Sequence, residues 1–118
     1  MKRREAGGNE RRKEPRFEVN LRCWLEREQQ TLFGTAINLS NGGMFLRTLP
    51  MVEAGSAVEL KLDMEEGVVH ALGRIAWANE PPPGKTPSSQ GSPGLGIAFT
   101  EVLAGQDLLR RFLRARSV

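Results

Sequence analysis

Apolar and polar residues alternate along six short segments of this chain, and this pattern limits the possible folds more than any other feature of the sequence. In residues 17–26, apolar side chains at every second position alternate with mostly polar ones. A period of two is typical of a strand with one buried face. The same pattern predicts further strands at 31–39, 44–48, 58–63, 68–78 and 95–99.

The spacing of apolar residues changes after the last predicted strand. Leu108, Leu109, Phe112 and Leu113 share one side of a helix, and arginines occupy much of the rest. Most links between the predicted strands are short, so strands that are neighbours in sequence are expected to be neighbours in the sheet. We therefore predict a mainly β chain, a six-stranded antiparallel barrel with a C-terminal α-helix over one open end.

In two of the predicted strands, the alternation predicts which side chains face the core. In the first, Cys23 is expected inside as a small core residue, whereas Trp24 falls on the polar face. In the second, alternation predicts one face with Phe33, Ile37 and Leu39 and an opposite face with Gly34, Ala36 and Asn38.

The length of 118 residues favours one domain with a core that needs no metal or disulfide. Residues 1–10 are basic and nearly free of hydrophobic side chains, which predicts a flexible tail before a single domain at 11–118. Residues 80–93 hold five of the seven prolines and no large apolar residue, so we expect a long exposed loop there.

Charge is distributed unevenly along the chain. Residues 1–16 carry seven basic and three acidic groups and residues 106–118 four basic and one acidic, whereas 17–105 carry six basic and ten acidic. Basic ends around an acidic body argue against a broad nucleic-acid surface, and with seven aromatic residues and no tyrosine few side chains remain for base stacking. A local anion site near one end fits the pattern better.

The chain has one cysteine, Cys23, and one histidine, His70. An intramolecular disulfide and a Cys/His zinc site are therefore excluded, and catalysis by a nucleophile and histidine is not expected. Glu65 and Glu66 lie in a predicted turn beside Gly67 without a nucleophile or metal set, so we predict no catalytic or metal-binding residues and no enzyme. No membrane-spanning segment or signal peptide is recognisable, so a cytoplasmic protein is expected.

The first motif that carries chemistry is a pair of arginines, Arg12 and Arg16, separated by three residues and preceded by Arg11. A guanidinium group can bind phosphate oxygens in a two-pronged manner, donate to the O6 and N7 edge of guanine and stack on a purine ring. A guanine nucleotide uses all three abilities.

The second motif is the sequence Asn38-Leu39-Ser40-Asn41-Gly42-Gly43, at the end of the second predicted strand. Asn38 and Ser40 are expected on one side of the strand end, and Gly43 is a point where backbone can approach a ligand. Together the two motifs resemble the Arg-x-x-x-Arg and Asp/Asn-x-Ser-x-x-Gly signatures of the PilZ family, bacterial receptor domains for cyclic di-GMP. The stretches 42–46, 73–77 and 94–99 are also similar to later strands of that family, and the resemblance covers residues 11–115.

The resemblance implies a PilZ-type barrel whose ligand is cyclic di-GMP, with no other cofactor. It implies that Arg12 and Arg16 bind phosphate and guanine, that Asn38 and Ser40 form hydrogen bonds near a guanine, and that Gly43 keeps the turn open. Arg11 is at a place that influences whether one or two copies of the dinucleotide bind, and a long cationic side chain there favours two. Asn38 stands where Asp is more common in the family and lacks its charge.

Such a receptor passes its signal to an effector protein that the sequence does not identify. An alternative is a PilZ-like adaptor that does not bind cyclic di-GMP and acts through protein–protein contacts. For that alternative, Trp24 and the helix arginines are the candidate contacts.

Overall fold

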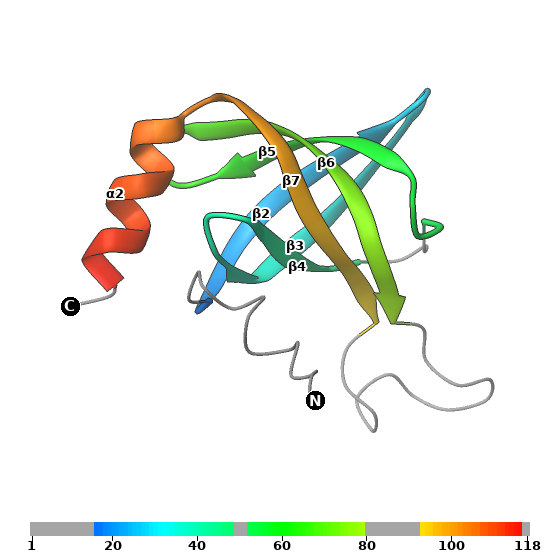
Figure 1. The fold of residues 1–118 in the computed structure, drawn as a ribbon, viewed down its shortest axis with the longest axis horizontal. Coiled ribbons are helices and arrows are strands. Elements are labelled where there is room, and N and C mark those ends of the chain that lie inside the picture. Colours follow the sequence, from blue (N-terminus) through cyan, green and yellow to red (C-terminus); the bar gives the residue numbers. More distant parts are fainter. Residues whose placement is uncertain (1–15, 49–51, 80–92, 117–118) are drawn as a thin grey trace, which may run out of the picture.

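A computed structural model describes residues 16–48, 52–79 and 93–116, which form a closed antiparallel barrel of six strands and one helix (Figure 1). Around the barrel the strands follow the order β2-β3-β4-β7-β6-β5, and β2 and β5 close the ring. The elements are β2 (Phe17–Arg27), β3 (Gln30–Leu39), β4 (Gly43–Arg47), β5 (Ala57–Asp63), β6 (Val68–Asn79), β7 (Gly94–Ala104) and α2 (Gln106–Arg116). The predicted fold class is confirmed.

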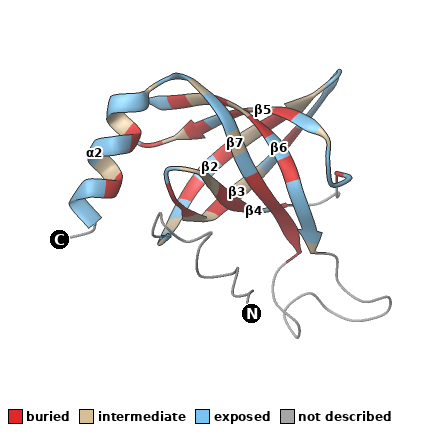
Figure 2. Cartoon of the chain, viewed as in Figure 1, coloured by how far each residue is buried: buried red, intermediate tan, exposed pale blue. Residues whose placement is uncertain are grey.

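Closure follows from the alternation in the sequence. Buried and more exposed residues alternate along β2, β5 and β6, as the red bands in Figure 2 show. Inward-facing side chains such as Cys23, Leu25, Leu60 and Ile75 are at most 1% exposed and form one core. A closed ring leaves no row of unpaired backbone groups at a sheet edge.

The predicted faces of β3 are wrong. Phe33 is 65% exposed, and the buried residues of this strand are Leu32, Ala36 and Leu39. The reason is an irregularity in the pairing with β4 between Ala36 and Asn38, where the strand carries an extra residue, Ile37. Such a bulge shifts the alternation by one position. Odd-numbered residues before the bulge therefore face the opposite side of the sheet from odd-numbered residues after it.

Tight turns connect β2 to β3 and β5 to β6, which pair as hairpins. The β2–β3 hairpin has a two-residue loop, and Glu28 within it has a φ of 56°. The predicted turn before β6 is also present, because the amide of Met64 donates to the carbonyl of Gly67 (2.9 Å) and Glu65 has a φ of 74°. Positive φ angles are unfavourable for residues with a side chain.

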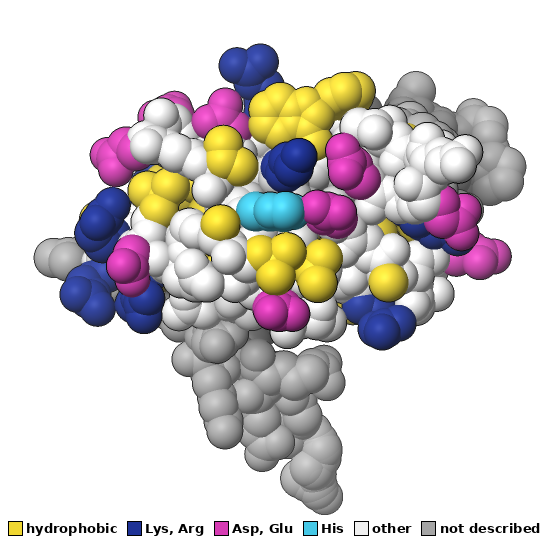
Figure 3. All heavy atoms as spheres, turned by 90° about the horizontal axis from the view of Figure 1, so that it is seen from above, with side chains coloured by type: hydrophobic (Ala, Val, Ile, Leu, Met, Phe, Trp, Pro, Cys, Tyr) yellow, Lys and Arg dark blue, Asp and Glu magenta, His cyan; other side chains and the backbone are white. Residues whose placement is uncertain are grey.

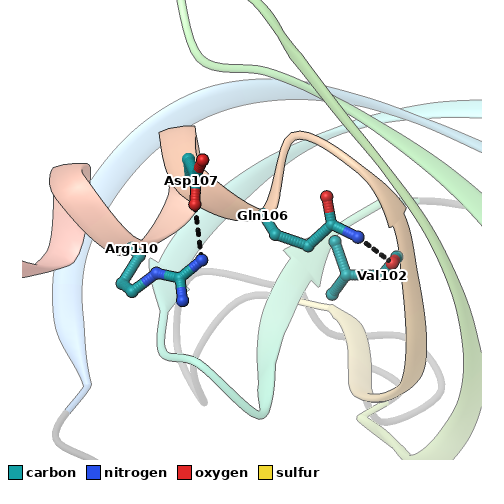
Figure 4. A network of polar contacts seen from close by, with 4 residues as sticks. All are labelled: Val102, Gln106, Asp107 and Arg110. Atoms are coloured by element: carbon teal, nitrogen blue, oxygen red, sulfur yellow. Dashed lines mark hydrogen bonds and ion pairs between the residues drawn. The ribbon is translucent and has the colours of Figure 1, made fainter.

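Helix α2 stands at one end of the barrel (Figure 1) and closes it with Leu109 and Leu113, which belong to the core. Gly105, just before the helix, has a φ of 88°, and its carbonyl accepts a hydrogen bond from the amide of Leu109 (2.9 Å). The first turn is tied to β7 and to itself (Figure 4): Gln106 Nε2 donates to the carbonyl of Val102 (2.8 Å), and Arg110 pairs with Asp107 (2.6 Å).

Some predictions concern segments that the structure does not describe. The tail at 1–10 lies outside the described residues, as does the loop predicted at 80–93 except for Pro93, which is buried next to β7. Among the described helices, none is long and apolar enough to cross a membrane.

Candidate functional site

A cavity of about 180 Å³ opens where the beginning of β2, the β3–β4 turn, the last part of β6 and the first part of β7 meet. It brings together Arg16, Ser40 and Gly43, three of the six residues predicted from the two motifs. Arg16 is exposed and, among the described residues that line the cavity, is the only charged one, so the mouth of the cavity favours an anion. The lining residues are Arg16, Ser40, Gly42, Gly43, Met44, Ala76, Trp77, Gly96, Ile97 and Ala98.

Ser40 builds the turn that forms one wall of this cavity. It is 6% exposed, and its Oγ accepts a hydrogen bond from the amide of Gly42 (3.1 Å) and donates to the carbonyl of Gly43 (3.4 Å). The amide of Ser40 donates to the same carbonyl (2.9 Å). Serine is favoured in such turns because its hydroxyl replaces a backbone partner, so Ser40 shapes the site before any ligand arrives.

Gly43 is needed for close contact between two strands. It is the first residue of β4 and pairs with Ala98 of β7, and a Cβ atom at this position would collide with the carbonyl oxygen of Ile97. Next to it, the amide of Phe99 donates to the carbonyl of Gly42 (2.8 Å). The glycine therefore permits a close approach to the backbone of β7. This contact holds the β3–β4 turn in place beside the cavity.

Asn38 does not line the cavity, although the motif predicts it beside Ser40. Its Oδ1 accepts a hydrogen bond from the amide of Phe45 (3.1 Å), at the place where the bulge interrupts the pairing of β3 and β4. The asparagine thus satisfies a backbone donor that the bulge would leave without a strand partner. Through Phe45 it is linked to Trp77, whose indole stacks on the ring of Phe45.

Trp77 is a lining residue that sequence reasoning did not single out. Its indole stacks on the ring of Phe45, with centroids 5.2 Å apart and planes 25° apart, and 44% of Trp77 remains exposed. Gly96 lies between them on β7 and pairs with both Phe45 and Trp77. A Cβ atom at Gly96 would collide with the indole, so the glycine creates the space in which the ring lies. The signal in the sequence was a glycine amid apolar residues of a strand.

Arg11 and Arg12 lie outside the described residues, so of the arginine motif only Arg16 is placed at the cavity. A larger cavity of about 510 Å³ lies elsewhere, between the turn before β6 and one face of α2. Glu65, Glu66, Arg111 and Arg116 line it, and none of the motif residues that the structure describes does. The described residues include no group of three or more His, Cys, Asp or Glu side chains that could hold a metal ion.

Solved structures share this fold. The Bacillus subtilis inhibitor of motility, MotI/DgrA, superposes with a TM-score of 0.70 at 16% identity, and the match covers 99% of this chain and 52% of that one. The PilZ domain of YcgR from Escherichia coli with c-di-GMP gives 0.66 at 19% identity, with 89% and 90% covered. YcgR in complex with c-di-GMP gives 0.70 at 21% identity, with 91% and 46% covered.

The present chain thus spans about half the length of MotI/DgrA and of the longer YcgR chain. A search against curated proteins found no match. The family model of the PilZ domain matches residues 10–115. Because this match covers nearly the whole sequence and the barrel agrees with it, the chain belongs to the PilZ domain family.

Proposed function

We propose that this protein binds cyclic di-GMP through Arg11, Arg12 and Arg16 together with the turn from Asn38 to Gly43, and relays the signal to a protein partner. PilZ domains are typically non-catalytic receptors, and both YcgR structures contain c-di-GMP. The observation that carries the proposal is the meeting of Arg16, Ser40 and Gly43 at one cavity, although they come from two separate parts of the sequence.

The cavity suits one part of the ligand better than the whole. Clefts that enclose drug-sized ligands measure roughly 300 to 1,000 Å³, whereas this one measures about 180 Å³. A single guanine base fits such a space, with the exposed indole of Trp77 offering a stacking surface and Arg16 a forked donor for phosphate or for the guanine edge. The other base and phosphate then lie outside the cavity, and we assign their binding to Arg11 and Arg12.

The expected affinity follows from these contacts. Each charge-assisted hydrogen bond contributes roughly 1.5–3 kcal/mol, and base stacking on an aromatic side chain contributes about 1–3 kcal/mol. Part of this gain offsets the ordering of long arginine side chains and the loss of ligand freedom. We therefore expect a dissociation constant of micromolar order, which corresponds to a binding free energy of about −8 kcal/mol.

Calorimetric titration with cyclic di-GMP tests the proposal, with GMP as a control ligand. We expect saturable binding in the natural protein and no measurable binding in Arg16→Ala. We expect the same loss in Arg16→Lys, because an ammonium group cannot form the fork. Arg47→Ala is the matched control, since Arg47 is exposed on β4 but does not line the cavity. Unchanged binding in both Arg16 variants would refute the proposed site.

The alternative function, an adaptor without a nucleotide ligand, is favoured by one observation. The exposed Phe33 and the half-buried Trp24 form an aromatic pair on the outside of the barrel, and neither lines the cavity. Absence of binding heat with cyclic di-GMP in the natural protein, together with a protein complex that Trp24→Ala disrupts, would support this alternative.

A further inference from the structure

The aromatic pair lies on the outer face of two neighbouring strands. Trp24 of β2 pairs with Phe33 of β3, and their rings meet edge to face with centroids 6.3 Å apart. At 65%, Phe33 is the most exposed large hydrophobic side chain of the described residues. An exposed apolar group of this kind, bordered by charges, is typical of a protein interaction surface.

Unpaired charges of both signs surround these rings. Arg22 and Glu26 lie two positions before and after Trp24 on the same side of β2, and Lys61 is its partner on β5. Within the part of the chain that the structure describes, none of these three charges forms an ion pair. Glu26 lies directly opposite another acid, Glu59, an arrangement that destabilises a sheet.

Figure 3 shows the same face from above. The histidine, in cyan, lies in its middle, with a basic side chain and a hydrophobic group in a row beyond it and acidic side chains at one side. In the register of the barrel, His70 pairs with Lys61 and Lys61 pairs with Trp24, so these three residues form one row across β6, β5 and β2. Glu59 contacts the imidazole of His70, so this acid already has a partner within the chain.

We propose that this face binds the same face of a second copy of the protein in a two-fold symmetric dimer. The two sheets cross at roughly a right angle, one of the two common ways in which sheets pack. The two-fold axis lies in the interface along the diagonal that passes through Trp24 and Glu59. Rotation about this axis lays the strands of one copy across the strands of the other. Each residue of one copy then meets the residue of the other copy that lies at the mirror-image position across this diagonal.

Under this symmetry the charges find partners. Glu26 of each copy meets Lys61 of the other, and Arg22 of each copy meets the ring of Phe33 of the other, where a guanidinium is attracted to an aromatic face. The two Trp24 side chains meet at the centre. Glu59 lies on the axis, beside the imidazole of His70 that it contacts.

A second copy explains the face better than a partner of one charge sign. A basic partner would be repelled by Arg22 and Lys61, and an acidic partner by Glu26 and Glu59, whereas an identical face supplies both signs in matched places. The three strands involved are about 5 Å apart, and five residues of each extend about 17 Å. A patch of this width and length covers a smaller area than the roughly 800 Å² that each partner buries in a standard interface. We therefore expect a weak dimer with a dissociation constant on the order of tens of micromolar.

Sedimentation equilibrium of the full chain, without nucleotide, from micromolar to millimolar concentration tests the dimer. Glu26→Lys and Lys61→Glu should each weaken association by about tenfold or more, because each brings like charges together. The double variant should restore it to within about threefold, since the pair is only exchanged. Glu101→Lys, an exposed charge on β7, is the matched control and should leave association unchanged.

Thermal unfolding of each variant establishes that it is folded. A protein that stays monomeric throughout, a dimer that the single exchanges do not weaken, or a double variant that does not recover would each overturn the proposal. Because the ligand is absent from this experiment, its failure would leave the proposed nucleotide site untouched.

Discussion

Replacement of Gly96 by alanine separates the stability of the fold from the geometry of the candidate site. The new methyl group would collide with the indole of Trp77 rather than with backbone at its closest contacts. Since Trp77 is 44% exposed, its ring has room to swing outward. The variant should therefore keep the barrel and lose the stacked arrangement of Trp77 on Phe45.

Two opposing effects determine how much Gly96→Ala changes the free energy of unfolding. Loss of the stacked pair costs about 0.5–1.5 kcal/mol, and replacing glycine by alanine at a compatible φ stabilises by about 0.4–1 kcal/mol through the unfolded chain. We expect the free energy of unfolding of Gly96→Ala to stay within about 1 kcal/mol of the natural protein. Loss of a base-stacking surface worth about 1–3 kcal/mol should raise the dissociation constant for cyclic di-GMP by roughly 5- to 150-fold.

Urea denaturation and calorimetric titration measure the two quantities. Gly67→Ala is the matched control, because it lies in the turn before β6, and its binding should be unchanged. Gly94→Ala is the contrasting case, since a Cβ atom there collides with the backbone oxygen of Leu46 and should destabilise the barrel. Displacement of the indole in Gly96→Ala without any loss of affinity would refute the stacking role of Trp77, and loss of more than about 3 kcal/mol in stability would refute its freedom to move.

Three further predictions concern stability and are measured by chemical denaturation. Asn38→Ala should lower the free energy of unfolding by about 1–3 kcal/mol because the amide of Phe45 is left without its acceptor. Asn38→Asp keeps an acceptor and should keep most of the stability. Equal losses of stability in the two variants would contradict this role of Asn38. Burial raises the pKa of Cys23 from 9.0 to about 12, so the folded state holds its proton more tightly, and stability should fall by roughly 1 kcal/mol per pH unit from pH 9 towards 12. If the stability of a Cys23→Ala variant fell equally steeply with pH, the loss would come from other groups. Glu28→Gly should gain about 0.5–1 kcal/mol by relieving a φ of 56° in the β2–β3 hairpin, and no gain would show that the turn is unstrained.

The fold could be predicted because its cause is local. Alternation with a period of two appears directly in the residues of β2 and β5, and the turn at 65–67 is marked by its glycine. The facing of Phe33 could not be predicted, because the bulge at Ile37 depends on pairing with β4. No residue type at that position announces an extra residue in the strand.

The candidate site was only partly visible in the sequence for a similar reason. Ser40 and Gly43 were found through the motif, but the close contact of Gly43 with Ile97 depends on β7, more than 50 residues further along the chain. Trp77 belongs to the site because β4, β7 and β6 are neighbours in the barrel, which places Phe45, Gly96 and Trp77 in one row. Chain neighbours alone do not reveal such a row.

The most direct test of the account is a titration of the isotope-labelled protein with cyclic di-GMP, followed through the NMR resonances of backbone amides and of the tryptophan indoles. We predict saturable shifts centred on Ser40, Gly43, Gly96 and the indole of Trp77, with the indole of Trp24 unaffected. Shifts confined to the cavity between Glu65 and helix α2, or no shifts at a ligand concentration well above micromolar, would contradict the assignment of the nucleotide site.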